Sequence, residues 1–327
     1  MSMDIQRLER IVENALQGAP LSRSDAALVI DWPEAGLNEL AEAAHRVRQH
    51  FFGDAVSFCG IVNARSGACS ENCAFCAQSA HHAAQSPRHD FLPLDEIVDA
   101  ARSLKAAGAT RFSIVTSGKA LSPADFQRLL DAVAAVADLG LVADCSPGIL
   151  DRAQLRALRQ AGCGAYHHNL ETGRSFFPRI CSTHAYDEDV EAVRNAVAEG
   201  LTVCSGGLFG LGETWADRLE LAGELRELGV QSVPVNFLQP IPGTPLQDRP
   251  LVGVSEAVRI LALLRFSLPD RHIRICGGRH SAFAGEDREQ AYLCGASGVM
   301  VGDYLTLKGR DATEDRTMAE RLGLHPE

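Results

Sequence analysis

The feature that most constrains the fold is an alternation of two kinds of segment that repeats from Ala55 onward. Apolar, β-branched runs typical of buried strands are followed by polar or glycine-rich turns and then by amphipathic helical stretches. Eight such runs begin at positions 55, 110, 141, 165, 202, 232, 272 and 298. This pattern over residues 55–306 predicts a closed (β/α)8 TIM-type barrel, in which the strand tips at one rim supply the functional site.

An open, doubly wound parallel sheet is the alternative. It is disfavoured because no G-x-G-x-x-G turn follows the first strand. Residues 1–54 carry apolar side chains at helical spacing and are expected to form an N-terminal helical extension. Residues 307–327 are rich in charge and are expected to form a mobile C-terminal tail.

Charge and hydropathy exclude several classes of protein. The net charge of −11 argues against nucleic acid as a partner, because phosphate binding relies on clustered Lys and Arg. The N-terminal residues carry charge every few positions, and no stretch approaches about 18 uninterrupted apolar residues. We therefore expect neither a secretion signal nor a membrane span, and a cytoplasmic location.

Three of the ten cysteines are crowded into NARSGACSENCAFCAQS, directly after the first expected strand. Cys69, Cys73 and Cys76 form a C-x3-C-x2-C pattern that can wrap one metal centre. A structural zinc site needs four ligands, and the neighbouring His81 and His82 point apart. An iron–sulfur cube held by three thiolates keeps one iron free for a non-protein ligand. The pattern favours a 4Fe–4S cluster over zinc and over three free thiols.

The triplet resembles that of the radical S-adenosylmethionine enzymes, whose free iron binds the amino and carboxyl groups of S-adenosylmethionine. Phe75 stands where that superfamily places a residue against the adenine. Further segments resemble the biotin synthase family: YHHNLET, VCSGGLFGLGET, SVPVNFLQPIPGTPL and IRICGGR. The resemblance implies sulfur insertion into dethiobiotin by way of a 5′-deoxyadenosyl radical. It also implies an electron donor such as flavodoxin or ferredoxin, and a homodimer.

The resemblance assigns further residues around S-adenosylmethionine and the substrate. Asn169 and Glu171 would contact S-adenosylmethionine, with Glu replacing the family's usual Asp. The glycine-rich segment would lie beside the adenine, and its matching residues are Gly206, Leu208, Gly210 and Glu213. Asn236 would contact the ureido ring of dethiobiotin, and His167, where the family has Asn, would be a second substrate contact. His167, Asn169 and Glu171 are two apart and would share one strand face.

The family carries an auxiliary iron–sulfur cluster, in its familiar form a 2Fe–2S centre held by three cysteines and an arginine. The resemblance places Cys145, Cys204 and Arg274 at three of these positions, but Ser113 at the fourth. Cys276 lies two residues beyond Arg274 and should face the same interior. We therefore expect Cys145, Cys204 and Cys276 to hold a variant cluster, such as a 4Fe type, with Arg274 as ligand or charge partner.

Other cysteines and one histidine have less definite roles. Cys276 has the alternative of being a small core residue. Cys181 is a weaker ligand candidate, and the remaining three cysteines are expected to be packing residues: Cys59, Cys163 and Cys294. His184 stands where the family has an arginine paired with the methionine carboxylate of S-adenosylmethionine.

Two other functions fit the triplet. Another radical S-adenosylmethionine enzyme of the same branch, such as a hydrogenase cofactor maturase or a mutase, would not need interior cysteines. A non-catalytic iron–sulfur scaffold would not cleave S-adenosylmethionine.

Overall fold

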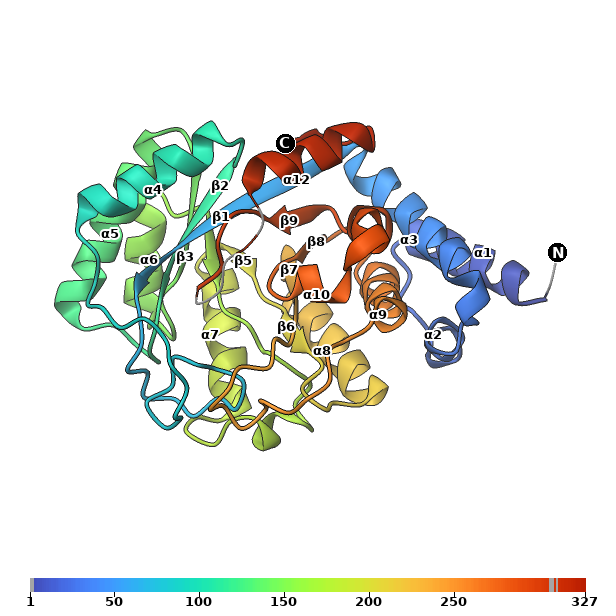
Figure 1. Cartoon of the computed structure of the whole chain (residues 1–327), viewed down its shortest axis with the longest axis horizontal. Helices are drawn as coiled ribbons and strands as arrows, with labels where there is room; N and C mark the ends of the chain where they lie inside the picture. Colours follow the sequence, from blue (N-terminus) through green and yellow to red (C-terminus); the bar gives the residue numbers. More distant parts are fainter. Residues whose placement is uncertain (1–2, 306–308, 310) are drawn as a thin grey trace.

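The computed structural model describes residues 3–305, 309 and 311–327, and its centre is a closed parallel barrel (Figure 1). The strands pair in parallel in the order β1-β2-β3-β4-β5-β7-β8-β9, with β6 also pairing β7, and β9 pairs with β1 to close the sheet. The barrel strands are β1 (Ala55–Arg65), β2 (Arg111–Thr116), β3 (Val142–Ser146), β4 (Ala165–His167), β5 (Thr202–Cys204), β6 (Gly207–Phe209), β7 (Ser232–Phe237), β8 (His272–Ile275) and β9 (Gly298–Met300). The predicted closed barrel is confirmed, and the doubly wound alternative is wrong.

Strands β5 and β6 together occupy one of the eight strand positions of the barrel, here called the β5–β6 stave. They are separated only by Ser205 and Gly206, and both pair with β7, through Cys204 beside Ser232 and Gly207 beside Val235. The register with β7 is the same on both sides of this interruption, so β5 and β6 occupy one strand position of the barrel.

Helices cover the outside of the barrel, as expected for βα units. They are α4 (Leu94–Ala106), α5 (Pro123–Asp138), α6 (Arg152–Gln160), α7 (Tyr186–Ala198), α8 (Trp215–Leu228) and α9 (Val254–Ser267), with short α10 (Arg279–Ala282) and α11 (Gln290–Leu293). Side chains of Ser122, Asp151 and Thr214 cap α5, α6 and α8 by accepting backbone N–H bonds. Nowhere in the described ranges does a helix have the length and apolar character needed to cross a membrane.

The N-terminal extension consists of α1 (Met3–Leu16), α2 (Arg23–Ile30) and α3 (Leu37–Phe52), which lie beside α9 (Figure 1). Leu40 and Val47 of α3 are buried with Leu263 and Phe266 of α9 in a second hydrophobic core. Arg48 is fully buried and donates to the Ala296 carbonyl at 3.2 Å. The extension is thus fixed to the barrel at the end where the strands begin.

The C-terminal residues fold back onto the barrel as α12 (Ala312–Arg321) and β10 (His325–Pro326). Asp315 of α12 is buried and forms an ion pair with Arg279 at 2.7 Å, and the Tyr292 hydroxyl donates to Asp315 at 2.8 Å. Strand β10 pairs with the start of β1. The expectation of a mobile tail is therefore wrong for residues 311–327, because charge on the helix surface concealed one buried carboxylate.

Candidate active site

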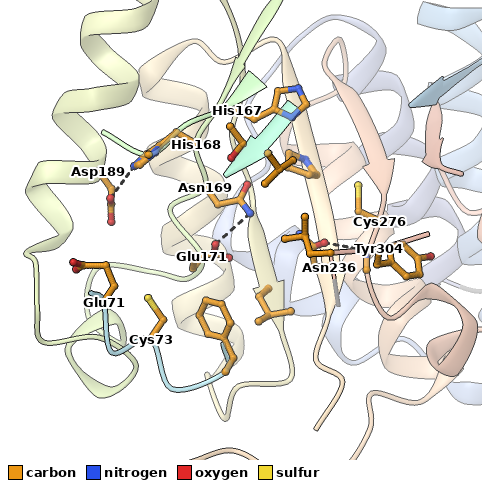
Figure 2. Close-up of a pocket in the computed structure, with 18 of the residues that line it drawn as sticks. Glu71, Cys73, His167, His168, Asn169, Glu171, Asp189, Asn236, Cys276 and Tyr304 are labelled. Carbon is orange, nitrogen blue, oxygen red and sulfur yellow. Dashed lines mark hydrogen bonds and ion pairs between the residues drawn. The ribbon is translucent and has the colours of Figure 1, made fainter. Parts of the chain in front are cut away.

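A cavity of about 480 Å³ opens at the carboxyl ends of the barrel strands (Figure 2). Its wall includes ten of the residues expected from the sequence: Cys69, Cys73, Phe75, His167, Asn169, Glu171, Cys204, Asn236, Arg274 and Cys276. These residues come from segments far apart in the chain, and the barrel brings them together because all its parallel strands end at the same rim.

The cysteine triplet lies on the loop after β1, which folds back on itself. The Cys69 N–H donates to the Gln78 carbonyl at 3.0 Å, and the Ala80 N–H donates to the Cys69 carbonyl at 2.8 Å. A tight turn in which the Cys76 N–H donates to the Cys73 carbonyl at 2.9 Å completes the loop. Burial raises the pKa of the Cys76 thiol to about 11, and the nearby Cys69 contributes to this rise. Backbone hydrogen bonds therefore hold the loop that carries all three sulfurs.

The donor set of this loop fits an iron–sulfur cluster. It offers three soft thiol ligands, and the Glu71 N–H points at the Cys69 sulfur, 3.5 Å away, as amides do in iron–sulfur sites. Cys181, the weaker ligand candidate for the auxiliary cluster, lies beside the triplet, with its sulfur 4.0 Å from that of Cys73. The loop after β4 reaches over the triplet, so the structure does not place Cys181 with the interior cysteines.

A hydrogen-bonded network of charged groups borders the triplet, and Figure 2 shows its Asp189–His168 pair. His184 Nδ1 lies 2.6 Å from a Glu71 oxygen, and its Nε2 lies 3.1 Å from an Asp189 oxygen. The other Asp189 oxygen is 2.8 Å from His168 Nε2. The hydrogen bond to Asp189 raises the pKa of His184 to about 9, so this imidazole is cationic at neutral pH. Glu71 and Asp189 were not identified from the sequence, where each looks like an ordinary surface carboxylate.

Asn169 and Glu171 follow directly after β4 and line the cavity. Asn169 Nδ2 donates to Glu171 Oε1 at 3.3 Å, and the Gly206 N–H donates to Asn169 Oδ1 at 3.2 Å. Glu171 has a φ of +65°, a strained value for a residue other than glycine, and burial raises its pKa to about 7. Strain together with a perturbed carboxyl group in a cleft is typical of functional sites. Because β4 ends at His167, strict alternation stops there, and His168 also lines the cavity.

The two predicted glycines are not part of the cavity wall, although Leu208 between them is. A Cβ at Gly206 would lie 2.1 Å from the Pro234 carbonyl oxygen. Gly210 has a φ of +96°, and its N–H donates to Glu213 Oε1 at 3.0 Å. Both glycines thus serve the backbone geometry of the β5–β6 stave, and their contact with S-adenosylmethionine stays a prediction.

Asn236 lies at the tip of β7 and is oriented by the backbone. Its Oδ1 accepts from the Gly277 N–H at 2.9 Å, and its Nδ2 donates to the Gly207 carbonyl at 3.3 Å. A primary amide has two N–H donors and two acceptor lone pairs, so one of each is left for a ligand. Figure 2 shows Asn236 close to Cys276 and Tyr304, on the wall opposite Glu71 and Cys73.

The deep part of the cavity is polar. Cys204 lies 3.2 Å from the Ser232 hydroxyl, which also accepts from Arg274 Nε at 2.8 Å. Arg274 donates in addition to the Ser57 hydroxyl at 2.5 Å. Burial acts to lower the pKa of the His167 imidazole, but Cys204 and Asp144 raise it well above its usual value.

Cys145 does not face this interior. Its sulfur lies 3.5 Å from that of Cys163, which precedes β4, and it is absent from the cavity wall. Asp144 takes the inward position instead and accepts a bidentate pair of hydrogen bonds from Arg111 at 2.9 and 2.7 Å. Inward-facing Ser113 is its register partner on β2. The sequence-based placement of Cys145 is therefore wrong by one residue, which on a strand reverses the face.

Cys59 of β1 was expected to be a packing residue, but it lines the cavity. Ile61, two residues further along β1, lines it as well, as alternation requires. The alternation within FCGIV was the available signal, but the sequence alone does not say which of the two faces is inward.

Comparisons with known proteins agree with this geometry. The model of the radical SAM superfamily matches residues 64–225, and that of the biotin and thiamin synthesis associated domain matches residues 234–325. A biotin synthase from Trichlorobacter lovleyi is 47% identical over 319 residues, which cover 97% of this chain and 96% of that protein. One from Geobacter sulfurreducens is 45% identical over 318 residues, covering 97% and 96%.

Solved structures show the same fold. Methylornithine synthase has a TM-score of 0.84 at 23% identity, with 97% of both chains covered. The hydrogenase maturase HydG has a TM-score of 0.82 at 18% identity, with 99% of this chain and 76% of that chain covered. At these identities the likeness concerns the fold alone.

Proposed function

Because the chain belongs to the biotin synthase family, we propose that it converts dethiobiotin to biotin by radical insertion of sulfur. The observation that carries this proposal is that one cavity holds two separate groups of thiols. Cys69 and Cys73 lie on its outer wall, and Cys204 and Cys276 lie on its deep wall. A substrate between them would be within reach of a radical source on one side and a sulfur source on the other.

At the outer wall, Cys69 and Cys73 would hold a 4Fe–4S cluster together with Cys76 of the same loop. A cluster bound there would supply the electron for cleavage of S-adenosylmethionine to methionine and a 5′-deoxyadenosyl radical. Asn169 and Glu171 present an amide and a carboxylate to the same space and would bind the hydroxyl and amino groups of S-adenosylmethionine. Phe75 would pack against the adenine.

His184 supplies positive charge at the edge of this site. The family-based expectation is an arginine at this position, and an imidazolium whose pKa is about 9 provides the same sign of charge at neutral pH. Both of its ring nitrogens are engaged by Glu71 and Asp189, so we propose that His184 positions these two carboxylates and offsets part of their negative charge beside the site.

At the substrate end, Asn236 has one free donor and one free acceptor, which suit the N–H and C=O of the ureido ring. His167 lies deeper, between Ser113 at 3.3 Å and Asp144 at 3.4 Å, and would border the substrate from below. An auxiliary iron–sulfur cluster in the deep wall would be the sulfur source. A flavodoxin or ferredoxin as electron donor and a homodimeric assembly complete the proposal.

The test is anaerobic incubation of iron- and sulfide-reconstituted protein with S-adenosylmethionine, a strong reductant and dethiobiotin, followed by mass spectrometry. Formation of both biotin and 5′-deoxyadenosine is expected. The Cys73→Ala variant should form neither product. Deoxyadenosine without biotin would overturn dethiobiotin as substrate and favour another reaction of the radical S-adenosylmethionine class. Absence of both products from the unaltered chain would overturn the radical mechanism.

A further inference from the structure

Three cysteines from different parts of the barrel wall face one cavity. Cys59 of β1, Cys204 of β5 and Cys276 just after β8 are 6%, 3% and 7% exposed, and all three line the cavity. None is in a disulfide. Three cysteines on the wall of one cavity form a larger donor set than packing needs, because a small apolar side chain would serve that purpose equally well.

The strand register places two of these thiols at the same level. Cys59 is the register partner of Met300 on β9, and Ile275 of β8 is the partner of Val299. Cys276, the next residue after Ile275, therefore stands level with Met300 and hence with Cys59. The two cysteines flank β9 from either side.

Cys204 approaches from the opposite part of the barrel wall. It contacts Ser232, whose hydroxyl accepts from Arg274, two residues before Cys276. Cys204 is therefore linked through one shared hydroxyl to the segment that carries Cys276, and all three cysteines line the same cavity.

The thiols of Cys59 and Cys276 make long, weak hydrogen bonds to nearby backbone carbonyls. Among the described residues, the Cys59 thiol donates to the carbonyl of Gly60 at 3.7 Å, and the Cys276 thiol donates to the carbonyl of Arg274 at 3.5 Å. These are long contacts for a weak donor, and they leave the sulfurs available as ligands. Arg274, by contrast, already donates to Ser57 and Ser232.

The positions that the family pattern suggests cannot provide the same set. Cys145 faces away from the cavity, toward Cys163. Asp144, which points inward instead, already forms an ion pair with Arg111. Ser113 offers a hydroxyl, which is a poor ligand for a thiolate-preferring centre.

We propose that the auxiliary iron–sulfur cluster of this chain is held by Cys59, Cys204 and Cys276, with Arg274 as a fixed neighbouring charge. The inference rests on the proposed function and specifies its sulfur-donating site. Thiolates are the ligands that iron–sulfur centres prefer, and three of them converge here from the wall of one polar cavity.

The experiment isolates this site by removing the first one. In a full-length chain with Cys69, Cys73 and Cys76 all replaced by Ala, anaerobic reconstitution should still load iron and acid-labile sulfide, with visible absorbance of the sulfide-to-iron type. Adding Cys59→Ala, Cys204→Ala or Cys276→Ala should abolish this loading. Adding Cys145→Ala is the matched control, because it removes an equally buried cysteine and should leave the loading unchanged.

Two outcomes would overturn the inference. One is loss of iron on Cys145→Ala with retention on Cys59→Ala, and the other is absence of iron from the triple variant itself. Circular dichroism melting of each metal-free variant separates ligand loss from misfolding, and a Cys59→Ser variant provides a smaller perturbation of the same site. Because iron loading is measured without S-adenosylmethionine or dethiobiotin, its result is independent of whether biotin is the product.

Discussion

Glu171 combines backbone strain with a buried carboxyl group, and both features oppose stability. With a φ of +65° and a pKa raised to about 7, it is held in place by the surrounding loop and by Asn169. A carboxyl group whose pKa is raised on folding binds its proton more tightly in the folded state. Stability is therefore full near pH 4.5 and falls as pH rises through about 7.

Glutamine does not ionise, so the Glu171→Gln variant should not lose stability as pH rises through about 7. The Tm of this variant should exceed that of the unaltered protein at pH 8, and the two Tm values should converge at pH 5. The measurement is thermal melting of the reconstituted protein without S-adenosylmethionine. The same substitution should weaken S-adenosylmethionine binding about tenfold or more, because a hydrogen bond to a charged group is lost. Glu227→Gln, on the exposed face of α8, is the control and should show neither effect. Equal Tm values for Glu171→Gln and the unaltered protein at pH 8 would contradict the argument.

Individual residues also show how far sequence reasoning reaches. The triplet could be recognised from the sequence because its spacing is local, and the structure places its three cysteines on one loop after β1; their role as ligands stays a prediction. Asp144 and Cys145 are both 0% exposed, and β1 has five consecutive buried residues, so a barrel strand buried on both sides hides which alternate set faces inward. Only the register with β2 assigns Asp144 to the interior, and register depends on residues distant in sequence.

At the level of elements, the broken β5–β6 stave depends on Gly206. Gly206→Ala would place a Cβ 2.1 Å from the Pro234 carbonyl oxygen, a contact that backbone atoms cannot relieve cheaply. We expect loss of S-adenosylmethionine binding and a lower Tm. Gly223→Ala in α8 meets no atom within 4 Å and should instead stabilise the protein by about 0.5–1 kcal/mol through helix propensity. Similar Tm values for the two variants would refute the role assigned to the break.

Helix α12 depends on one buried ion pair. Asp315→Asn leaves Arg279 buried with its charge uncompensated, which should cost about 3–5 kcal/mol of unfolding free energy. Glu320→Gln on the same helix breaks only an exposed contact with Arg316 at 3.6 Å and should cost less than about 1 kcal/mol. Urea unfolding of the two variants measures the difference. Equal costs would mean that α12 contributes little to the folded state.

For the whole molecule, the N-terminal extension supports the barrel at the end opposite the candidate active site. Leu40 of α3 is fully buried in the core that α3 shares with α9, so Leu40→Ala should lower the free energy of unfolding by about 2–5 kcal/mol. Glu42→Ala on the exposed face of α3 should change stability by less than about 0.5 kcal/mol. Both should load the same iron per chain after reconstitution at low temperature. A selective loss of iron in Leu40→Ala would mean that the extension shapes the site as well as supporting it.

Cys73 and Cys276 face one cavity, and dioxygen that enters through its mouth therefore meets both groups of thiols. A molecule that fills the cavity shields both groups at once. Aerobic damage to the two proposed metal centres is thus expected to rise and fall together, and bound S-adenosylmethionine and substrate should protect both from oxidation. The shared cavity keeps the two groups of thiols near each other, and it also gives dioxygen access to both.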